Sequence, residues 1–218
     1  MLPFTREQFL AAFVTYNEAI WPAQLVAYLL GLAAVALLFW RPPTADRAIA
    51  GILAAMWIWT GVGYHWLNFS QINKAALLFA ALFVVQGTAL AYAGIVRERL
   101  RFGVDAGPVA WVGIAFVAYS AVLYPLVGIG TGHAYPEMPM FGVTPCPVAI
   151  FTFGMLLLTS SHVSHWLLVI PSIWSLIGGS AAFLLGIPQD WLLLVSGLIA
   201  VPVLVLRDRD RSHTTRMA

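Results

Sequence analysis

Residues 147–161 form a short apolar run, PVAIFTFGMLLLTSS, that follows a proline-rich segment. An α-helix rises 1.5 Å per residue, so a helix of this length reaches only about 22 Å. The hydrocarbon core of a bilayer is about 30 Å thick and usually requires about 20 apolar residues. Whether this run crosses a membrane therefore determines both the number of spans and the side on which the C-terminus lies.

The composition indicates an integral membrane protein and excludes the soluble enzyme folds. Of its 218 residues, 61% are apolar and only 9% are charged, whereas soluble domains have about 45–50% apolar and about 25% charged residues. The formal net charge of +2 does not suggest binding to nucleic acid, so no such partner is expected. Cys146 is the single cysteine, which excludes an internal disulfide and a CxxC site.

Seven apolar segments are candidates for transmembrane helices. The predicted spans are 22–40, 48–67, 74–96, 108–129, 147–161, 163–187 and 191–206. A polar cytoplasmic tail is predicted at 207–218, and an amphipathic interfacial helix is predicted within 1–21. In that helix Thr5 and Gln8 fit a capping box. Its apolar face consists of Phe9, Phe13, Tyr16 and Ile20.

The distribution of basic residues favours seven spans, because cytoplasmic loops carry an excess of Lys and Arg. With seven spans, nine basic residues share one side, and only Arg6 and Lys74 lie on the other. The nine are Arg41, Arg47, Arg97, Arg99, Arg101, Arg207, Arg209, Arg211 and Arg216. With six spans the counts become five and six. The predicted fold is an all-α integral membrane protein of the inner (plasma) membrane, with about seven transmembrane helices, the N-terminus outside and the C-terminus cytoplasmic.

The predicted spans carry no Asp, Glu, Lys or Arg at their centres. Ionisable groups at such positions usually mark ion paths or proton relays, so coupled ion transport is not favoured. Lys74, the only lysine, lies at the start of a span, which excludes a buried retinal Schiff base. The sequence also lacks a phosphate-binding loop and an HExxH helix, and no enzymatic reaction is predicted from it.

The segment GTGHAYPEMPMFGVTPCP, residues 130–147, contains four prolines and cannot be a continuous helix. It is nevertheless too apolar for a solvated loop. Non-helical backbone near a membrane is tolerated where it is buried in protein or lines a cavity. The segment is therefore predicted to form an ordered extracytoplasmic cap over the outer mouth of the bundle.

The cap and its neighbours supply the candidate binding residues. Soft donors suited to Cu(I) or another thiophilic ion are Cys146, His133, Met138 and Met140. Further candidates for lining the site are His65, Asn68, Asn73 and Glu137 on the same side. On the cytoplasmic side, His162 and His165 are spaced three apart on one predicted helix face, a spacing able to share a metal.

A structural role for these residues is the alternative interpretation, and it stays open. Cys146 is of a type that commonly packs as a small apolar residue, and methionines beside prolines commonly fill irregular gaps. Histidines near an interface often bond a carbonyl group.

Three segments carry a resemblance to a known family. They are LPFTREQFLAAFVTYNEAIWPAQ at 2–24, WTGVGYHWLNFSQINKAA at 59–76 and HAYPEMPMFGVTPCPVAIFTFG at 133–154. Together they resemble a bacterial multi-pass membrane family catalogued as domain of unknown function 6064. The resemblance implies a membrane location and a shared helical bundle, and it transfers no activity.

The predicted function is that of a transporter or channel-like protein for a small neutral solute or a soft metal ion, with that metal ion as candidate cofactor. One alternative is a membrane haem protein or enzyme with His65 and His133 as ligands. Another is a structural or accessory subunit. The expected partners are the lipid bilayer and either a second copy of the chain or another subunit of a membrane complex.

Overall fold

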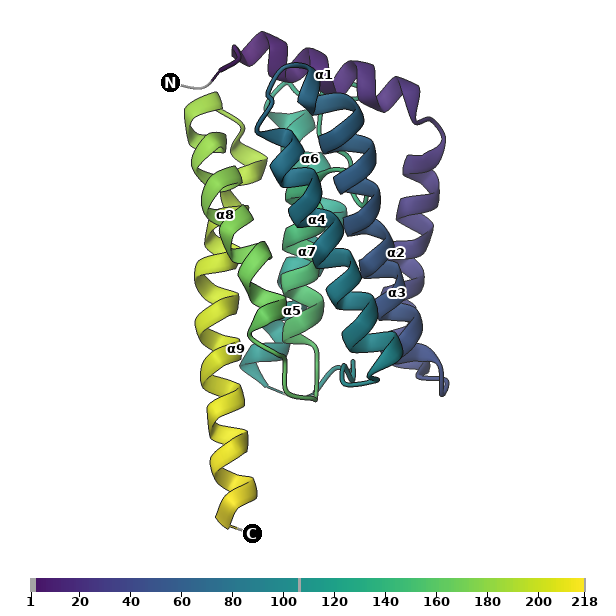
Figure 1. The fold of residues 1–218 in the computed structure, drawn as a ribbon, viewed down its shortest axis with the longest axis vertical. Helices are drawn as coiled ribbons and strands as arrows, with labels where there is room; N and C mark the ends of the chain where they lie inside the picture. Colours follow the sequence, from purple (N-terminus) through teal and green to yellow (C-terminus); the bar gives the residue numbers. More distant parts are fainter. Residues whose placement is uncertain (1–2, 106, 218) are drawn as a thin grey trace.

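The computed structural model describes residues 3–105 and 107–217, and these residues form helices joined by loops, without a strand (Figure 1). The α-helices are α1 (Arg6–Ala19), α2 (Ala23–Trp40), α3 (Ala45–Trp59), α4 (Ala76–Ala91), α5 (Pro108–Ala118), α6 (Tyr124–Gly130), α7 (Pro145–Leu157), α8 (Trp166–Leu185) and α9 (Trp191–Met217). Three π-helical segments extend or join them: η1 (Thr60–Asn68), η3 (Tyr92–Val96) and η4 (Tyr119–Leu123). Two short 3-10 turns are η2 (Phe69–Gln71) and η5 (Pro188–Asp190).

Six of the helical stretches are long and apolar enough to cross a membrane. They are Ala23–Trp40, Ala45–Gln71, Ala76–Val96, Pro108–Gly130, Trp166–Leu185 and Pro188–Arg209. Each overlaps a span predicted from the sequence. The finding that these helices suit a membrane agrees with the composition.

Helix α7 differs from these six because it has only 13 residues and every one of them is buried. It contacts α3, α5, α8 and α9 and lies inside the bundle (Figure 1). A helix surrounded by protein need not match the thickness of the bilayer, because its neighbours shield it from lipid. Residues Pro145–Leu157 therefore form a central core helix, and a total of seven spans stays a prediction.

The two ends of the bundle differ in charge. At one end Arg41 donates to the Phe102 carbonyl, Arg101 contacts Asp46 at 3.2 Å, and Arg207 donates to the Thr159 carbonyl at 2.9 Å. These contacts join the loops after α2, η3 and α7 with α9, and we call this the basic end. The opposite end is covered by α1, which lies across it (Figure 1), and we call it the α1 end.

Helix α1 forms where the sequence predicted an amphipathic helix, and it begins with the predicted capping box. The Thr5 side chain accepts from the Gln8 N–H, and the Gln8 side chain accepts from the Thr5 N–H, which confirms the capping box. Phe13 and Tyr16 of α1 are buried against the bundle. The apolar face of α1 thus packs across the protein.

The part of the cap between α6 and α7, residues 131–144, lies partly beneath α1. The Asn17 side chain donates to the carbonyls of Pro136 and Met138, both at 2.8 Å, and the Tyr16 hydroxyl donates to the Val143 carbonyl at 2.7 Å. Phe141 is buried against Gly31 of α2. The segment is therefore ordered and enters the bundle, as its apolar residues predicted.

Two boundaries differ from the prediction. Helix α9 continues through the predicted tail to Met217, and Asp208 is buried there, accepting a hydrogen bond from the Val163 N–H at 2.8 Å. Helix α8 begins at Trp166, after an extended segment, so His162 and His165 precede the helix and do not share a helix face. The hydrogen bond between Asp208 and Val163 joins the segment before α8 to α9.

Candidate functional site

A cavity of about 190 Å³ lies at the α1 end, where α1, η1, α4, α7, α8 and η5 meet. A known apolar cavity of about 150 Å³ holds benzene, so this volume suits a small organic molecule. The aromatic side chains of its wall are Phe4, Phe9, Phe13, Tyr64, Phe69, Phe79 and Trp174. Its polar residues are Asn73, Cys146 and Asp190.

The aromatic wall is a connected set of rings. The ring centroids of Phe9 and Phe13 are 5.0 Å apart, those of Phe13 and Tyr64 are 5.4 Å apart, and those of Tyr64 and Phe69 are 5.5 Å apart. Phe79 and Trp174 continue the wall on α4 and α8, with centroids 5.4 Å apart. Aromatic rings at these separations attract one another in stacked and edge-to-face arrangements. This packing holds the side chains of the cavity wall together.

Asp190 reaches the cavity because the turn between α8 and α9 folds back into the bundle. Gly186 ends α8 with a positive φ of 64°, which favours glycine. The turn Pro188–Asp190 follows, and Asp190 immediately precedes α9. As a result, Asp190 is only 3% exposed.

The carboxylate of Asp190 has neutral neighbours. The Tyr124 hydroxyl of α6 donates a hydrogen bond to Oδ1, and the Cys146 thiol at the start of α7 is its other polar neighbour. The described residues place no Lys or Arg within ion-pair distance of it. Keeping a buried carboxyl group ionised without a counter-ion is costly.

Three buried side chains near the cavity have polar atoms without a hydrogen-bond partner among the described residues. Trp174 lines the cavity, and its indole N–H lies near the Cys146 thiol without forming a hydrogen bond of good geometry. Both ring nitrogens of His65 are unpartnered, and its ring lies 5.1 Å from that of Trp174, behind the aromatic wall. Both amide atoms of Gln189, next to Asp190, are also unpartnered.

The structure brings only some of the predicted site residues to this cavity. Cys146 and Asn73 line it, and His65 lies directly behind its wall. Asn68 donates to the Ala12 carbonyl at 3.0 Å and so helps to hold α1 in place. Glu137 is exposed on the cap.

His133 has a separate role at the α1 end. Its Nε2 accepts a hydrogen bond from Arg6 Nη2 at 2.8 Å, and its Nδ1 lies 3.3 Å from the Thr131 hydroxyl. Burial, and then the Arg6 guanidinium, lower the pKa of His133, while Glu137 acts in the opposite direction. Arg6 also donates to the Leu185 carbonyl at 3.0 Å, so it connects α1, the cap and α8.

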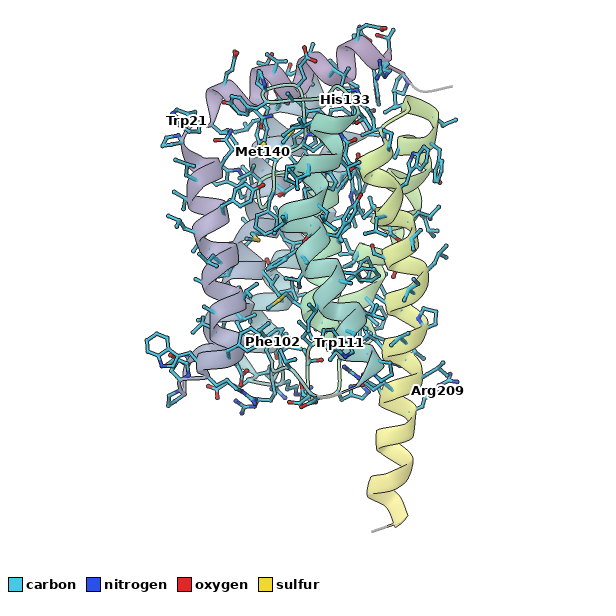
Figure 2. The ribbon with its side chains drawn as sticks, turned by 180° about the vertical axis from the view of Figure 1, so that it is seen from behind. Trp21, Phe102, Trp111, His133, Met140 and Arg209 are labelled. Carbon is cyan, nitrogen blue, oxygen red and sulfur yellow. The ribbon has the colours of Figure 1, made fainter. Side chains whose placement is uncertain are left out.

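The four predicted soft donors have different neighbours. Met138 lies near Gly128, Met140 packs beside the Phe13 and Tyr16 cluster, and Cys146 faces Asp190. Figure 2 shows His133 and Met140 on separate parts of the α1 end. Among the described residues, no three His, Cys, Asp or Glu side chains gather closely enough to hold a metal ion.

The haem alternative does not fit the residues proposed for it. His65 is fully enclosed by aromatic side chains, and the Nε2 lone pair of His133 accepts the hydrogen bond from Arg6. At the basic end, the rings of His162 and His165 are 5.9 Å apart and exposed, and His162 Nε2 lies 4.0 Å from Asp208 Oδ2.

Sequence reasoning missed Asp190, Tyr124 and Trp174. Asp190 stands at the border of a predicted span, where an acidic residue is normally solvated. One signal was available, because Asp190 is the only acidic residue between Glu137 and Asp208. Tyr124 and Trp174 lie within apolar stretches, and the sequence does not show which face of a helix they occupy.

The fold and this site define a class of protein: a bundle of membrane-type helices that encloses a small aromatic cavity with a buried carboxylate. Residues 6–215 match the family of unknown function DUF6064, so the chain belongs to this family. This confirms the resemblance carried by the three sequence segments. No curated protein and no solved structure matches the chain.

Proposed function

We propose that this protein is a multi-pass membrane protein that binds a small organic cation, such as a protonated amine, in the cavity at Asp190. The observation that carries the proposal is a buried carboxylate with only neutral neighbours inside an aromatic wall. The carboxylate supplies the counter-charge for the cation. Aromatic faces attract a desolvated cation by about 2 kcal/mol.

The size and polarity of the cavity narrow the ligand further. By comparison with the benzene-sized cavity, about 190 Å³ holds roughly six to eight non-hydrogen atoms. Among the described residues, the Trp174 N–H is a buried donor on the wall without a hydrogen-bond partner, and it supports a ligand that also carries a hydrogen-bond acceptor. An amino alcohol of this size combines both features.

Binding at one end of the bundle is the first step that a transporter requires, and we extend the proposal to transport. The favoured solute is a cation, where sequence reasoning alone favoured a neutral solute or a soft metal ion. The soft-metal site at Cys146, His133, Met138 and Met140 stays a prediction, which metal analysis of the purified protein tests. The accessory-subunit alternative predicts a membrane protein that copurifies.

The test compares a cation with a neutral molecule of the same shape. Benzylamine and benzyl alcohol have equal numbers of non-hydrogen atoms, and only the amine is charged at neutral pH. The thermal unfolding midpoint of the detergent-purified protein is measured with increasing amounts of each. We expect benzylamine to raise the midpoint, because a ligand that binds only the folded state stabilises it. Benzyl alcohol should have little effect.

Variants locate the site. Asp190→Asn should remove the effect of benzylamine, whereas Glu137→Gln, which neutralises an exposed acidic residue at the same end, should retain it. If Asp190→Asn does not fold, Trp174→Phe replaces the indole with a smaller aromatic ring and removes the N–H. It should weaken binding of an amino alcohol more than of benzylamine. Equal stabilisation by benzyl alcohol, or full benzylamine binding by Asp190→Asn, would refute the proposal.

A further inference from the structure

A second hollow, of about 540 Å³, lies at the basic end between the last turns of α4 and η3 and the start of α8. Its apolar part includes Ala89, Ala93 and Leu167, and its rim includes Arg97, Arg99 and Trp166. We propose that this groove binds a membrane phospholipid with an anionic headgroup. The proposal is independent of the Asp190 cavity, which lies at the other end of the bundle.

The backbone after η3 places both arginines at the groove. The Arg97 N–H donates to the Tyr92 carbonyl at 2.8 Å, and the Arg99 N–H donates to the Ala93 carbonyl at 2.9 Å. Between them Glu98 has a positive φ of 48° and pairs with Arg47 of α3 at 3.4 Å. The turn therefore separates Glu98 from its two neighbours, and Arg97 and Arg99 line the groove while Glu98 does not.

The acidic side chains around the groove are engaged by other groups. Glu98 pairs with Arg47, and Asp208 pairs with Arg207 at 3.1 Å and accepts from the Val163 N–H. Within the described chain, neither Arg97 nor Arg99 has a carboxylate within 4.0 Å. The groove therefore presents uncompensated positive charge, which complements an anionic headgroup.

The aromatic and apolar residues identify the anion as part of a lipid. Trp166 is 81% exposed and Tyr92 is 54% exposed, and both line the groove. Amphipathic rings of this kind are enriched where a protein meets the headgroup layer. The apolar part suits an acyl chain, and guanidinium groups bind phosphate oxygens with two parallel hydrogen bonds. Basic pockets between transmembrane helices are known to bind anionic headgroups.

The experiment uses the full chain, purified in a neutral detergent and titrated with phosphatidylglycerol or phosphatidylcholine of identical acyl chains, with bound lipid counted by native mass spectrometry. We expect phosphatidylglycerol to bind at least tenfold more tightly than phosphatidylcholine. Each arginine neutralised should weaken phosphatidylglycerol binding about fivefold. Arg97→Gln with Arg99→Gln should therefore reduce the preference to near unity.

Three controls test whether binding depends on this groove, on its positive charge, and on a lipid rather than free phosphate. Lys74→Gln neutralises an exposed cation at the α1 end and should leave lipid binding unchanged. Arg97→Lys with Arg99→Lys keeps the charge and loses the paired hydrogen bonds, so it should bind with intermediate affinity even if the Gln pair does not fold. Inorganic phosphate alone should not displace the lipid. Three results would each overturn the proposal. The first is equal binding of both lipids, and the second is unchanged phosphatidylglycerol binding in both double variants. The third is displacement of the lipid by phosphate.

Discussion

At the residue scale, Asp190 differs from the other acidic residues whose contacts are described above. Asp46, Glu98 and Asp208 each pair with an arginine at the basic end. Asp190 is buried at the α1 end beside a tyrosine hydroxyl and a thiol. A cation would supply the counter-charge that an ionised Asp190 lacks among these neighbours, and this supports the proposed cationic ligand.

The hydroxyl of Tyr124 should contribute measurably to this site. Tyr124→Phe removes the donor to Asp190, and a hydrogen bond to a charged group is worth about 1.5–3 kcal/mol. We expect the thermal midpoint without ligand to fall by roughly 3–12 °C. Tyr28→Phe is the matched control, because no hydrogen bond from the half-buried Tyr28 hydroxyl occurs among the described contacts of α2. Equal losses in the two variants would contradict the role assigned to Tyr124.

The contact between Arg6 and His133 predicts a pH dependence. The pKa of His133 is lowered in the folded protein, so near its unfolded value of about 6.5 the unfolded state binds more protons. Stability should therefore decrease as the pH falls through about 6.5, because a protonated His133 loses the acceptor that Arg6 uses. Thermal midpoints measured between pH 8 and pH 5 check this. His133→Gln should flatten the profile, and an unchanged slope would show that other groups cause it.

Sequence reasoning at this scale found Cys146 and missed its partners. Cys146 is conspicuous as the single cysteine beside a helix start, and it does line the cavity. Asp190 lies beside Cys146 because the α8–α9 turn folds back into the bundle. Trp174 lies there because of the face that α8 turns toward the cavity. Neither the turn nor this orientation of α8 is encoded in a local pattern that a single sequence displays.

At the scale of elements, the cap is the segment on which the α1 end depends. Gly142 has a φ of 75°, and a Cβ there would lie 2.7 Å from the Ala27 Cβ of α2. Gly132 also has a positive φ, of 87°, with open space around it. Both positions would strain the backbone of an alanine, but only an alanine at 142 would also clash with a neighbouring helix. Comparing the two therefore distinguishes the cost of backbone strain from the cost of a steric clash.

Alanine at these positions gives a paired prediction. Gly132→Ala should cost about 1 kcal/mol, because only the left-handed backbone is strained. Gly142→Ala should cost about 1–3 kcal/mol more, because α2 and the cap must also move apart. Thermal midpoints of the two variants decide this, and equal shifts would mean that the cap is not tightly packed on α2.

The helices were largely predictable, because long apolar segments with clear ends leave few alternatives. The position of α7 in the centre of the bundle was not predictable. Its apolar residues fit either a span or a core helix, and only packing on all sides distinguishes the two. Helices α8 and α9 both end or begin at residues other than the predicted span limits, and the hydrogen bond between Asp208 and Val163 in this region joins residues 45 positions apart, a contact that no local pattern displays.

At the scale of the whole molecule, the basic loops and the cap lie at opposite ends of the bundle. The arginine-containing loops meet at the basic end, while α1 and the cap cover the other end (Figure 1). The positive-inside rule then predicts that the basic end is cytoplasmic. The orientation follows from charge alone, so it needs a direct test.

Thiol labelling in cells tests the orientation. In a Cys146→Ser background, Glu137→Cys places a thiol on the exposed part of the cap, and Ser164→Cys places one on the exposed segment before α8. A membrane-impermeant maleimide should label the first variant in intact cells and the second only after the membrane is permeabilised. The reverse pattern would place the cap in the cytoplasm.

Equilibrium binding shows whether the Asp190 cavity takes up a small cation. Calorimetric titration of the purified protein with benzylamine should give saturable binding with one site per chain. Benzyl alcohol should not bind measurably, and Asp190→Asn should abolish the benzylamine signal while Glu137→Gln preserves it. Binding that is equally strong for the alcohol, or that survives in Asp190→Asn, would contradict the claim.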